Sequence, residues 1–406
     1  MTIANEKYAY PKFIKVQRGQ KRIPLIIHGQ GVFVFESNNS TLLTMFMLLD
    51  SKKKAGLTVT FRADGVRVNT YPELKPLVDS TNTRGLSKIP GAYYWFNIDA
   101  QNCRLAAGIG ETRIETSVYH YQFEITEENK SFLEGITAIL IPEIYSPIEA
   151  LRILRDPIMK SLPMVVKNTN FITMKDLARM SYLPKSYLSQ GLQKLHDCVA
   201  GNQFKLNDFE FPNFSKAIDY SINTPGCWCY ERLKAKSDQF GGGIQETYLR
   251  ITLGENNGES PGIPHIMEIW PSGHYSPVHN HGGANAIIRV LRGEIDVSLY
   301  PFLSNEVDRF GHILFKKGDV TWISPSLNQV HKLQNYGKKA CITIQCYMYD
   351  KSDMTHYDYF DYIDGKGMEQ QFEPDSDMGF LQFKAMIHSE WKLRPRCLPF
   401  FYTVTV

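Results

Sequence analysis

The chain has 406 residues, 43% of them hydrophobic and 21% charged, with a formal net charge of +3. This length and composition predict a globular protein of two domains, and the charge is too small to indicate nucleic acid or a membrane as a partner. Residues 1–12 contain polar and charged residues throughout, and no later segment has about 18 consecutive apolar residues, so we expect no signal peptide, no membrane span and a cytoplasmic location.

The segment from Gly31 to about Pro142 has the pattern of strands and turns. Runs such as GVFVFES, LTVTFRADGVRVNTY and AYYWFNID are rich in β-branched and aromatic residues that partly alternate, and Gly, Asn or Asp separates them. Ala63-Asp64-Gly65 lies between two such runs and predicts a hairpin turn. We therefore predict a β-sandwich-like domain over residues 1–146, which could serve as a binding or interaction module.

Two motifs in this first domain invite a functional interpretation. The aromatic run Tyr93-Tyr94-Trp95-Phe96 could stack on a sugar or a base, although such runs more often belong to a core. Gly108-Ile109-Gly110 lacks the third glycine and the following helix of a nucleotide-binding turn. We predict core packing for the first motif and no nucleotide role for the second.

Between residues 147 and 187 the sequence predicts a helical connector. The run SPIEALRILRDPIMKSLP is short and amphipathic and ends at prolines, and TMKDLARMSYL opens with a capping-box arrangement of Thr173 and Asp176. The run SYLSQGLQKLHDCVAG then has apolar residues at helical spacing. These helices would join the two domains.

The seven cysteines of the chain are scattered, and Cys227-Trp228-Cys229 contains the only close pair. A single C-x-C without a second cluster is weak evidence for a zinc site. The sequence therefore predicts reduced, buried thiols rather than a disulfide framework.

Short strands return from Thr247 onward. Apolar and β-branched runs follow one another with Gly, Asp, Asn or Pro in nearly every gap and no helical pattern between them. Such a series predicts a closed or double-sheet β-barrel. We place this second domain at residues 188–365 and treat residues 366–406 as a C-terminal extension.

His279-Asn280-His281 and His331 form the pattern that carries most chemistry. An H-x-H pair on a strand points both imidazoles to one face, because side chains alternate with a period of two. A third histidine from a neighbouring strand would complete a three-nitrogen metal site with open positions. The alternative interpretation is three histidines that only satisfy internal hydrogen bonds.

The surroundings of these histidines resemble the two motifs of the cupin superfamily. The first motif is Gly273-x5-His279-x-His281, and the second runs from Gly318 through Pro325 to His331-x3-Asn335. The glutamate that usually follows the H-x-H is missing, because the stretch reads GGANAI. The resemblance therefore implies a jelly-roll barrel with three neutral ligands, which leave the full charge of the ion to attract anions such as thiolates.

Residues 188–365 resemble the cysteine dioxygenase family more specifically. Several motifs of that family occur in the same order, namely the leading run LQKLHDCVAG, Tyr248-Leu249-Arg250, Trp270-x2-Gly273-His274-Tyr275-Ser276-x2-His279-x-His281, His331-x3-Asn335, Tyr347 and Thr355-His356. The resemblance implies a thiol dioxygenase in which His279, His281 and His331 hold Fe(II).

The same resemblance implies roles for further residues. Arg250 would pair with a substrate carboxylate, a task that suits its planar and permanently charged guanidinium group. Tyr347 would donate a hydrogen bond to the substrate or to bound oxygen, and Tyr349 would replace it if the register differs by two residues. The other substrate-binding residues that the resemblance implies are Tyr248, Trp270 and His356.

The chain departs from the family at two places. Ala286 stands where animal members have the cysteine that forms a thioether with the tyrosine, so no such crosslink can form. Thr343 and Gln345 stand where the family has Ser and His before the tyrosine. Glutamine can orient a phenol but does not titrate, so a proton relay through a histidine is not expected here.

These observations predict an Fe(II)-dependent oxidoreductase that adds both atoms of O2 to the sulfur of a small thiol. L-Cysteine is the first expected substrate, because Arg250 corresponds to the arginine of the cysteine-using branch, and cysteine catabolism would be the process served. The alternatives are 3-mercaptopropionate, cysteamine or a peptide N-terminal cysteine as substrate. A further alternative is a non-catalytic metal-binding cupin whose first domain is the working part. The oligomeric state stays open.

Overall fold

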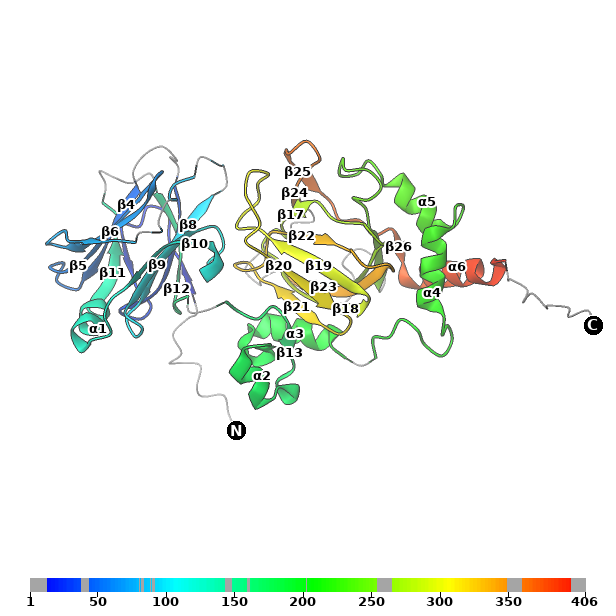
Figure 1. Ribbon diagram of the computed structural model, residues 1–406, viewed down its shortest axis with the longest axis horizontal. Helices are drawn as coiled ribbons and strands as arrows, with labels where there is room; N and C mark the ends of the chain where they lie inside the picture. Colours follow the sequence, from blue (N-terminus) through cyan, green and yellow to red (C-terminus); the bar gives the residue numbers. More distant parts are fainter. Residues whose placement is uncertain are drawn as a thin grey trace, which may run out of the picture. The chain divides into compact units, whose positions relative to one another are not determined.

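The computed structural model consists of two compact units (Figure 1). The first comprises Met1–Leu162, Leu299–Gly311 and Ser326–Val330, and the second comprises Pro163–Ser298, His312–Pro325 and His331–Val406. The structure describes residues 13–395 apart from 38–43, 80, 82–83, 88, 90–91, 143–147, 159–160, 202, 254–264 and 349–359.

Two six-stranded sheets build the first unit, and the strand pairs that the structure describes in them are antiparallel. In spatial order, the first sheet contains β1 (Phe13–Lys15), β12 (Ile148–Leu154), β3 (Gln30–Ser37), β8 (Tyr93–Asp99), β9 (Arg104–Ile109) and β10 (Ser117–Gln122). The second sheet contains β2 (Arg22–Pro24), β11 (Ile136–Leu140), β4 (Thr44–Asp50), β5 (Gly56–Arg62), β6 (Gly65–Tyr71) and β7 (Pro76–Leu77). Helix α1 (Glu127–Glu134) precedes β11.

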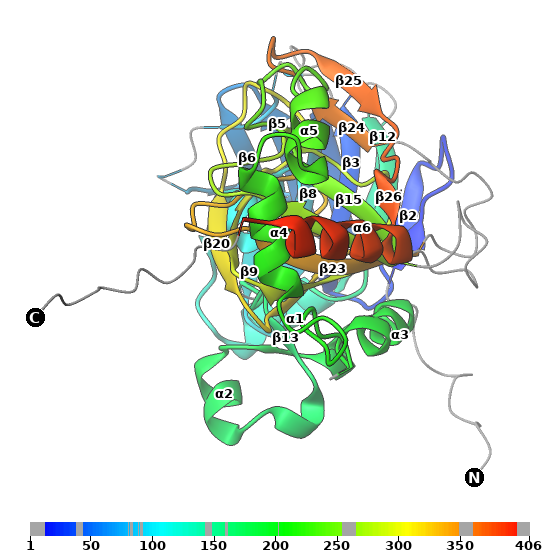
Figure 2. The same cartoon turned by 90° about the vertical axis from the view of Figure 1, so that its right-hand side faces the viewer.

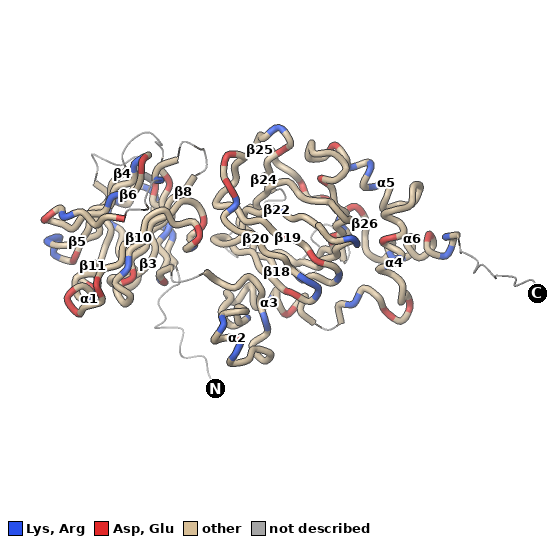
Figure 3. Tube along the Cα trace, in the orientation of Figure 1, with Lys and Arg blue, Asp and Glu red and all other residues tan. Residues whose placement is uncertain are grey.

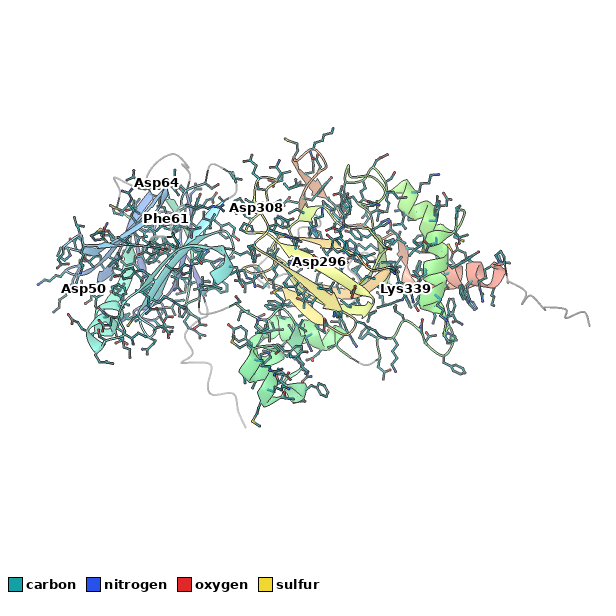
Figure 4. The ribbon with its side chains drawn as sticks, in the orientation of Figure 1. Asp50, Phe61, Asp64, Asp296, Asp308 and Lys339 are labelled. Carbon is teal, nitrogen blue, oxygen red and sulfur yellow. The ribbon has the colours of Figure 1, made fainter. Side chains whose placement is uncertain are left out.

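Aromatic side chains from both sheets form the core of the first unit. Phe33 of one sheet packs edge-on against Phe46 of the other, with ring centroids 5.0 Å apart. Phe61 lies in this core, whereas Asp64 lies at the turn between β5 and β6, as Figure 4 shows. Arg62 pairs with Gly65 across that turn, so the predicted hairpin is confirmed.

The aromatic run of the first unit belongs to its interior, as the sequence predicted. Trp95 and Phe96 are fully buried on β8. A side chain at Gly108 would collide with the Trp95 ring at 2.2 Å, and one at Gly110 would collide with the Pro301 backbone at 2.3 Å. These glycines therefore permit close packing against the Trp95 ring and the Pro301 backbone.

The helical prediction for the start of the connector is wrong. Residues Ile148–Leu154 form β12, which pairs with both β1 and β3 in the first sheet. The pairing register shifts between Ala150 and Arg152, and this bulge interrupts the alternation of buried and exposed side chains that marks a strand in sequence. The later part of the prediction is confirmed, since α2 (Met174–Arg179) begins with the capping box of Thr173 and Asp176.

The second unit also contains two six-stranded sheets. In spatial order, one contains β21 (Val320–Ile323), β18 (Asn285–Arg292), β23 (Cys341–Met348), β16 (His265–Trp270), β15 (Leu249–Leu253) and β26 (Met378–Gly379), and we call it the arginine sheet because it carries Arg250. The other contains β20 (Gly311–Lys316), β19 (Glu294–Leu299), β22 (His331–Gln334), β17 (Val278–His279), β24 (Phe360–Ile363) and β25 (Glu369–Phe372), and we call it the histidine sheet. The chain is thus mainly β, and the run of strands predicted from Thr247 onward is confirmed. A short parallel pair, β13 (Val166–Lys167) with β14 (Leu183–Pro184), lies outside both sheets.

Helices cover the outer face of the arginine sheet. Apolar side chains of α4 (Phe214–Asn223), α5 (Trp228–Ala235) and α6 (Phe380–Leu393) pack on Leu249, Ile251 and other outward residues of its strands. Figure 2 shows α4 and α6 crossing in front of these strands. Helix α3 (Gln190–Val199), which the sequence predicted, contacts β18 and β23. No helix in the described ranges is long and apolar enough to cross a membrane.

The segment that we treated as a C-terminal extension is an integral part of the second unit. β26 pairs in parallel with β15, and Phe383 and Ile387 of α6 are fully buried against the arginine sheet. β25 completes the edge of the histidine sheet. Figure 3 shows acidic and basic residues interspersed along both units, in keeping with the small net charge.

Candidate metal centre

The three histidines of the sequence motifs come together inside the second unit. His279 and His331 are direct partners on the antiparallel strands β17 and β22, and His281 follows two residues after His279. Their imidazole nitrogens lie within 4.8 Å of one another, and Nε2 of His281 is 3.1 Å from Nε2 of His331. Within the described ranges this is the only such group of three or more His, Cys, Asp or Glu residues.

Burial keeps the His279 and His281 imidazoles neutral. It lowers the pKa of His279 to about 4, against a weaker opposing effect of the Pro277 carbonyl. It also lowers the pKa of His281 well below the usual value, with help from the neighbouring His331 and His279. Neutral imidazole is the form that binds a metal ion, so the site is prepared for one at ordinary pH.

The geometry of the group fits a metal ion. Two nitrogens that bind one ion at about 2.1 Å and at right angles are about 3 Å apart. The separation of 3.1 Å between the His281 and His331 nitrogens agrees with this value. Nδ1 of His279 lies 3.1 Å from the Pro277 carbonyl, to which it can donate a hydrogen bond, and this tautomer leaves Nε2 free as a ligand.

Two buried polar side chains fix the strands that carry the histidines. The Asn335 amide group donates hydrogen bonds to the carbonyls of Trp270, Pro271 and Lys339, and its oxygen accepts one from the Gly337 amide. The Ser276 hydroxyl accepts a hydrogen bond from the Leu333 amide at 3.0 Å. These bonds join the approach to β17 with the end of β22, which explains why serine and asparagine accompany the histidines in the sequence.

The inner face of the arginine sheet carries the other predicted site residues. Arg250 on β15 pairs with Glu268 on β16, and Glu268 pairs in turn with Thr343 on β23. Direct partners on adjacent strands share a face, and so do residues two apart on one strand, such as Gln345 and Tyr347. The apolar residues between them face the outer helices, so the polar residues face the interior of the unit.

Arg250 lies near the histidines and is held by the C-terminal segment. Its charge contributes to the lowered pKa of His281, and its guanidinium donates a hydrogen bond to the Pro374 carbonyl. Its backbone amide donates to the Asp377 carboxylate at 2.7 Å. The structure therefore places a nearly buried cation close to the candidate metal site.

Tyr347 also lies beside the histidines. Its ring stacks on the His281 ring with centroids 5.8 Å apart. Ala286 is its direct partner on β18, so a methyl group stands where a thioether-forming cysteine would have to lie. Tyr349 and His356, which the sequence also suggested, lie outside the described residues.

Tyr248 and Trp270 form a stacked pair on the same inner face. Their ring centroids are 4.2 Å apart with an interplanar angle of 18°, and both side chains are buried. The indole of Trp270 lies within hydrogen-bonding reach of the Glu268 carboxylate. The pair forms an aromatic wall next to Arg250 and Glu268.

Glu268 is the residue of this face that sequence reasoning missed. It is 7% exposed, and burial raises its pKa to about 7. The charges of Arg250 and Lys236 act against this rise, and so do hydrogen bonds that the carboxylate accepts from the Gln345 and Trp270 side chains. The signal was present, since a lone carboxylate interrupts the apolar run HIMEIW. Only the strand register shows that this carboxylate faces Arg250.

Comparison with known proteins identifies distant relatives of the chain. Over 162 residues, 39% of this chain and 72% of the relative, the chain is 21% identical to cysteine dioxygenase type 1 of Rattus norvegicus and of Mus musculus. Its identity to the Bos taurus protein of the same name is 20% over the same length. The chain is therefore a distant homologue of cysteine dioxygenase type 1 over 39% of its length, as the sequence motifs indicated. No family model matches the chain.

Solved structures that resemble the chain include cupin domains. The Cupin_2 domain of an XRE-family transcriptional regulator from Enterobacter cloacae aligns with 26% of this chain and 98% of its own, with a TM-score of 0.21 and 13% identity. The cupin domain of Schizosaccharomyces pombe Cnp3 aligns with 26% of this chain and 67% of its own, with a TM-score of 0.21 and 19% identity.

Proposed function

We propose that this distant homologue of cysteine dioxygenase type 1 is a non-haem Fe(II) thiol dioxygenase whose second unit is a cupin barrel. The observation that carries the proposal is the buried group of His279, His281 and His331 close to Arg250. Three neutral nitrogen ligands suit iron and leave coordination positions open. A permanently charged guanidinium beside them suits a substrate that bears a carboxylate.

The proposed reaction balances without a further reductant. A thiol and O2 give a sulfinate and a proton, so two S–O bonds form, the O–O bond breaks, and sulfur donates the electrons. Bound Fe(II) would supply a Lewis-acidic and redox-active centre at which a thiolate and O2 can meet, chemistry that redox-inert zinc cannot provide.

The side chains of this chain would bind and orient the substrate. Arg250 would hold the carboxylate, and its contact with Pro374 would keep the guanidinium in place. Tyr347 would donate its phenolic hydrogen to the substrate or to oxygen, with Ala286 leaving its ring uncrosslinked. The aromatic wall of Tyr248 and Trp270 would exclude water from the same region.

L-Cysteine is the substrate that we propose first. It provides the thiol for the metal and the carboxylate for Arg250. A peptide N-terminal cysteine has no free carboxylate next to its thiol and would leave Arg250 without a function. The mercapto acid 3-mercaptopropionate and the amine cysteamine each lack one of the charged groups of cysteine.

Oxygen uptake tests the proposal directly. The full chain, loaded with Fe(II) without oxygen, is mixed with each of these small thiols, and O2 consumption and sulfinate are measured together. We expect equal amounts of O2 consumed and sulfinate formed with at least one thiol, and loss of both in His331→Ala. A protein that binds iron but consumes no O2 with any thiol would instead be a metal-binding cupin without this activity.

A further inference from the structure

A pocket with a volume of about 720 Å³ lies in the second unit, among residues that the proposed thiol chemistry does not use. Its walls come from residues 204–207 before α4, from residues 289–292 at the end of β18, and from the turn at residues 317–318 between β20 and β21. The described residues that line it include no Asp or Glu, whereas four are cations, namely Lys205, Arg289, Arg292 and Lys317. Such a lining attracts anions.

A β-bulge brings the two arginines of this pocket to the outer face of the arginine sheet. Arg289 and Arg292 are three residues apart, so a regular strand would point them to opposite faces. The register of β18 against β23 shifts between Val290 and Arg292, and this irregularity interrupts the alternation. Both guanidinium groups then reach the outer helices. Arg289 donates to the Val199 carbonyl of α3 at 3.0 Å, and Arg292 donates to the Asp219 carboxylate of α4 at 2.8 Å.

Arg289 keeps free hydrogen-bond donors although its side chain is half-buried. Its Nη1 donates to the carbonyls of Val199 and Gly201 at 3.0 and 2.7 Å. Its Nε and Nη2 have no partner within the residues that the structure describes. Burial lowers the pKa of this guanidinium, which shows that water screens its charge less than that of a surface arginine. A half-buried cation with unused donors suits an anionic ligand.

The two lysines of the pocket are also without an acidic partner. Lys205 and Lys317 are exposed, and no ion pair engages their ammonium groups within the described ranges. Arg292 differs from them, because the Asp219 carboxylate compensates its charge. Three positive charges of the lining therefore stay uncompensated in the described part of the chain, on Lys205, Arg289 and Lys317.

Backbone hydrogen bonds hold the walls of the pocket in place. The Gly318 amide donates to the Val290 carbonyl at 2.8 Å, which fixes the turn that carries Lys317 against β18. The Ser215 amide in the first turn of α4 donates to the Asn207 side-chain oxygen at 2.9 Å. This bond ties the loop before α4 to the helix and leaves the Asn207 amide nitrogen as a further donor. The cations are thus presented by anchored elements.

We propose that this pocket binds a diphosphate group, either on a nucleoside diphosphate or as inorganic pyrophosphate. A diphosphate has about three negative charges at neutral pH, which matches the three uncompensated cations. Guanidinium and ammonium groups are strong donors to phosphate oxygens. The volume is within the range of small-molecule sites, and Phe204, Leu206 and Leu291 supply apolar surface for an organic part of the ligand. This site is independent of the proposed thiol chemistry.

Calorimetry on the full chain tests the site with four probes, which are ADP, AMP, inorganic pyrophosphate and adenosine. We expect ADP and pyrophosphate to bind, AMP to bind at least about tenfold more weakly than ADP, and adenosine not to bind detectably. Tighter binding of ADP than of pyrophosphate would assign the site to nucleotides. Equal affinities for the two would assign it to the diphosphate group alone.

The two exposed lysines give the sharpest variant. Lys205→Gln combined with Lys317→Gln should weaken ADP and pyrophosphate about tenfold, because two cations are lost. Lys316→Gln is the matched control, since Lys316 is an equally exposed neighbour outside the pocket lining, and it should leave both affinities unchanged. Arg289→Gln should weaken both ligands about 10- to 100-fold. Arg289 also holds the end of α3, so urea unfolding of this variant is measured alongside.

Several outcomes would overturn the diphosphate site. These are a wild-type protein that binds neither ADP nor pyrophosphate, adenosine that binds as tightly as ADP, full affinity in the double lysine variant, or an equal loss in Lys316→Gln. The measurements need neither iron nor a thiol. Their result is therefore separate from the fate of the dioxygenase proposal.

Discussion

His279 shows how burial prepares a ligand at the scale of one residue. Removal from water disfavours the protonated ring, and the Pro277 carbonyl accepts a hydrogen bond from Nδ1 and fixes the remaining lone pair on Nε2. The pairing of His279 with His331 across two strands then brings a second imidazole to the same point. The protonation state of His279 thus follows from its burial, and the nitrogen that it offers to a metal ion follows from its hydrogen bond to the Pro277 carbonyl.

This lowered pKa predicts a pH dependence of stability in the metal-free protein. Below pH 6.5 the unfolded chain protonates His279, whereas the native chain does so only near pH 4. The unfolded state therefore binds more protons in this window, and native stability falls as pH falls, by up to about 3 kcal/mol from this residue. The stability advantage of wild type over His279→Gln in urea unfolding should shrink from pH 6.5 to pH 4. A stability difference between wild type and His279→Gln that stays the same from pH 6.5 to pH 4 would contradict the lowered pKa of His279 as the cause.

At the scale of elements, Asn335 holds the site together. Its side chain satisfies four backbone groups near the ends of β16 and β22 and is itself fully buried. Backbone groups that lose their partners inside a protein pay the full cost of desolvation. The position of His331 at the start of β22 thus depends on an amide group four residues away.

Asn335→Ala should lower the free energy of unfolding by about 2 to 4 kcal/mol, because it leaves these groups unpaired. Urea unfolding of the full chain measures the loss, and iron binding should weaken with it. Asn223→Ala is the control, since the Asn223 amide donates an exposed hydrogen bond to the Asp219 carbonyl. A loss of similar size in both variants would argue against the role of Asn335.

The strands were predictable from sequence wherever side chains alternate without interruption. The histidine motif was found because fixed spacing on a strand also fixes the face, whereas Arg250 and Tyr347 were found through the resemblance to the cysteine dioxygenase family. Two features needed the fold. The bulge after Ala150 interrupts the alternation of side chains that would identify β12 as a strand. The position of Glu268 opposite Arg250 depends on the pairing register of β15 and β16, which no local sequence pattern specifies. Register is a property of tertiary packing, so local propensity could not reveal that Glu268 lies opposite Arg250.

At the scale of the whole molecule, the two units do not correspond to two continuous stretches of chain. The first unit includes Leu299–Gly311 and Ser326–Val330, which the sequence assigned to the second domain. Phe302 enters the core of the first unit, and the Arg113 guanidinium donates a 2.7 Å hydrogen bond to the Asn328 side chain. The Gln329 amide donates to the Glu111 carboxylate at 2.8 Å. The first unit is completed by two segments that come much later in the sequence and are flanked by residues of the second unit.

Phe302→Ala should therefore destabilise the first unit although it changes a residue after β19. Removal of a buried phenylalanine costs about 3 to 5 kcal/mol, and Phe302 is 4% exposed. Hydrogen exchange in the full chain should show faster exchange in β3 and β8 and unchanged exchange in β16 and β23. Faster exchange confined to β16 and β23 would show that this residue supports the second unit instead.

The fate of both oxygen atoms tests the central proposal most directly. The Fe(II)-loaded full chain is supplied with L-cysteine and ¹⁸O₂ in ordinary water, and the product is analysed by mass spectrometry. The proposed dioxygenase places both labelled atoms in one sulfinate, because neither oxygen comes from water. A product that carries one labelled atom or none, or oxidation of the thiol to a disulfide alone, would contradict the account.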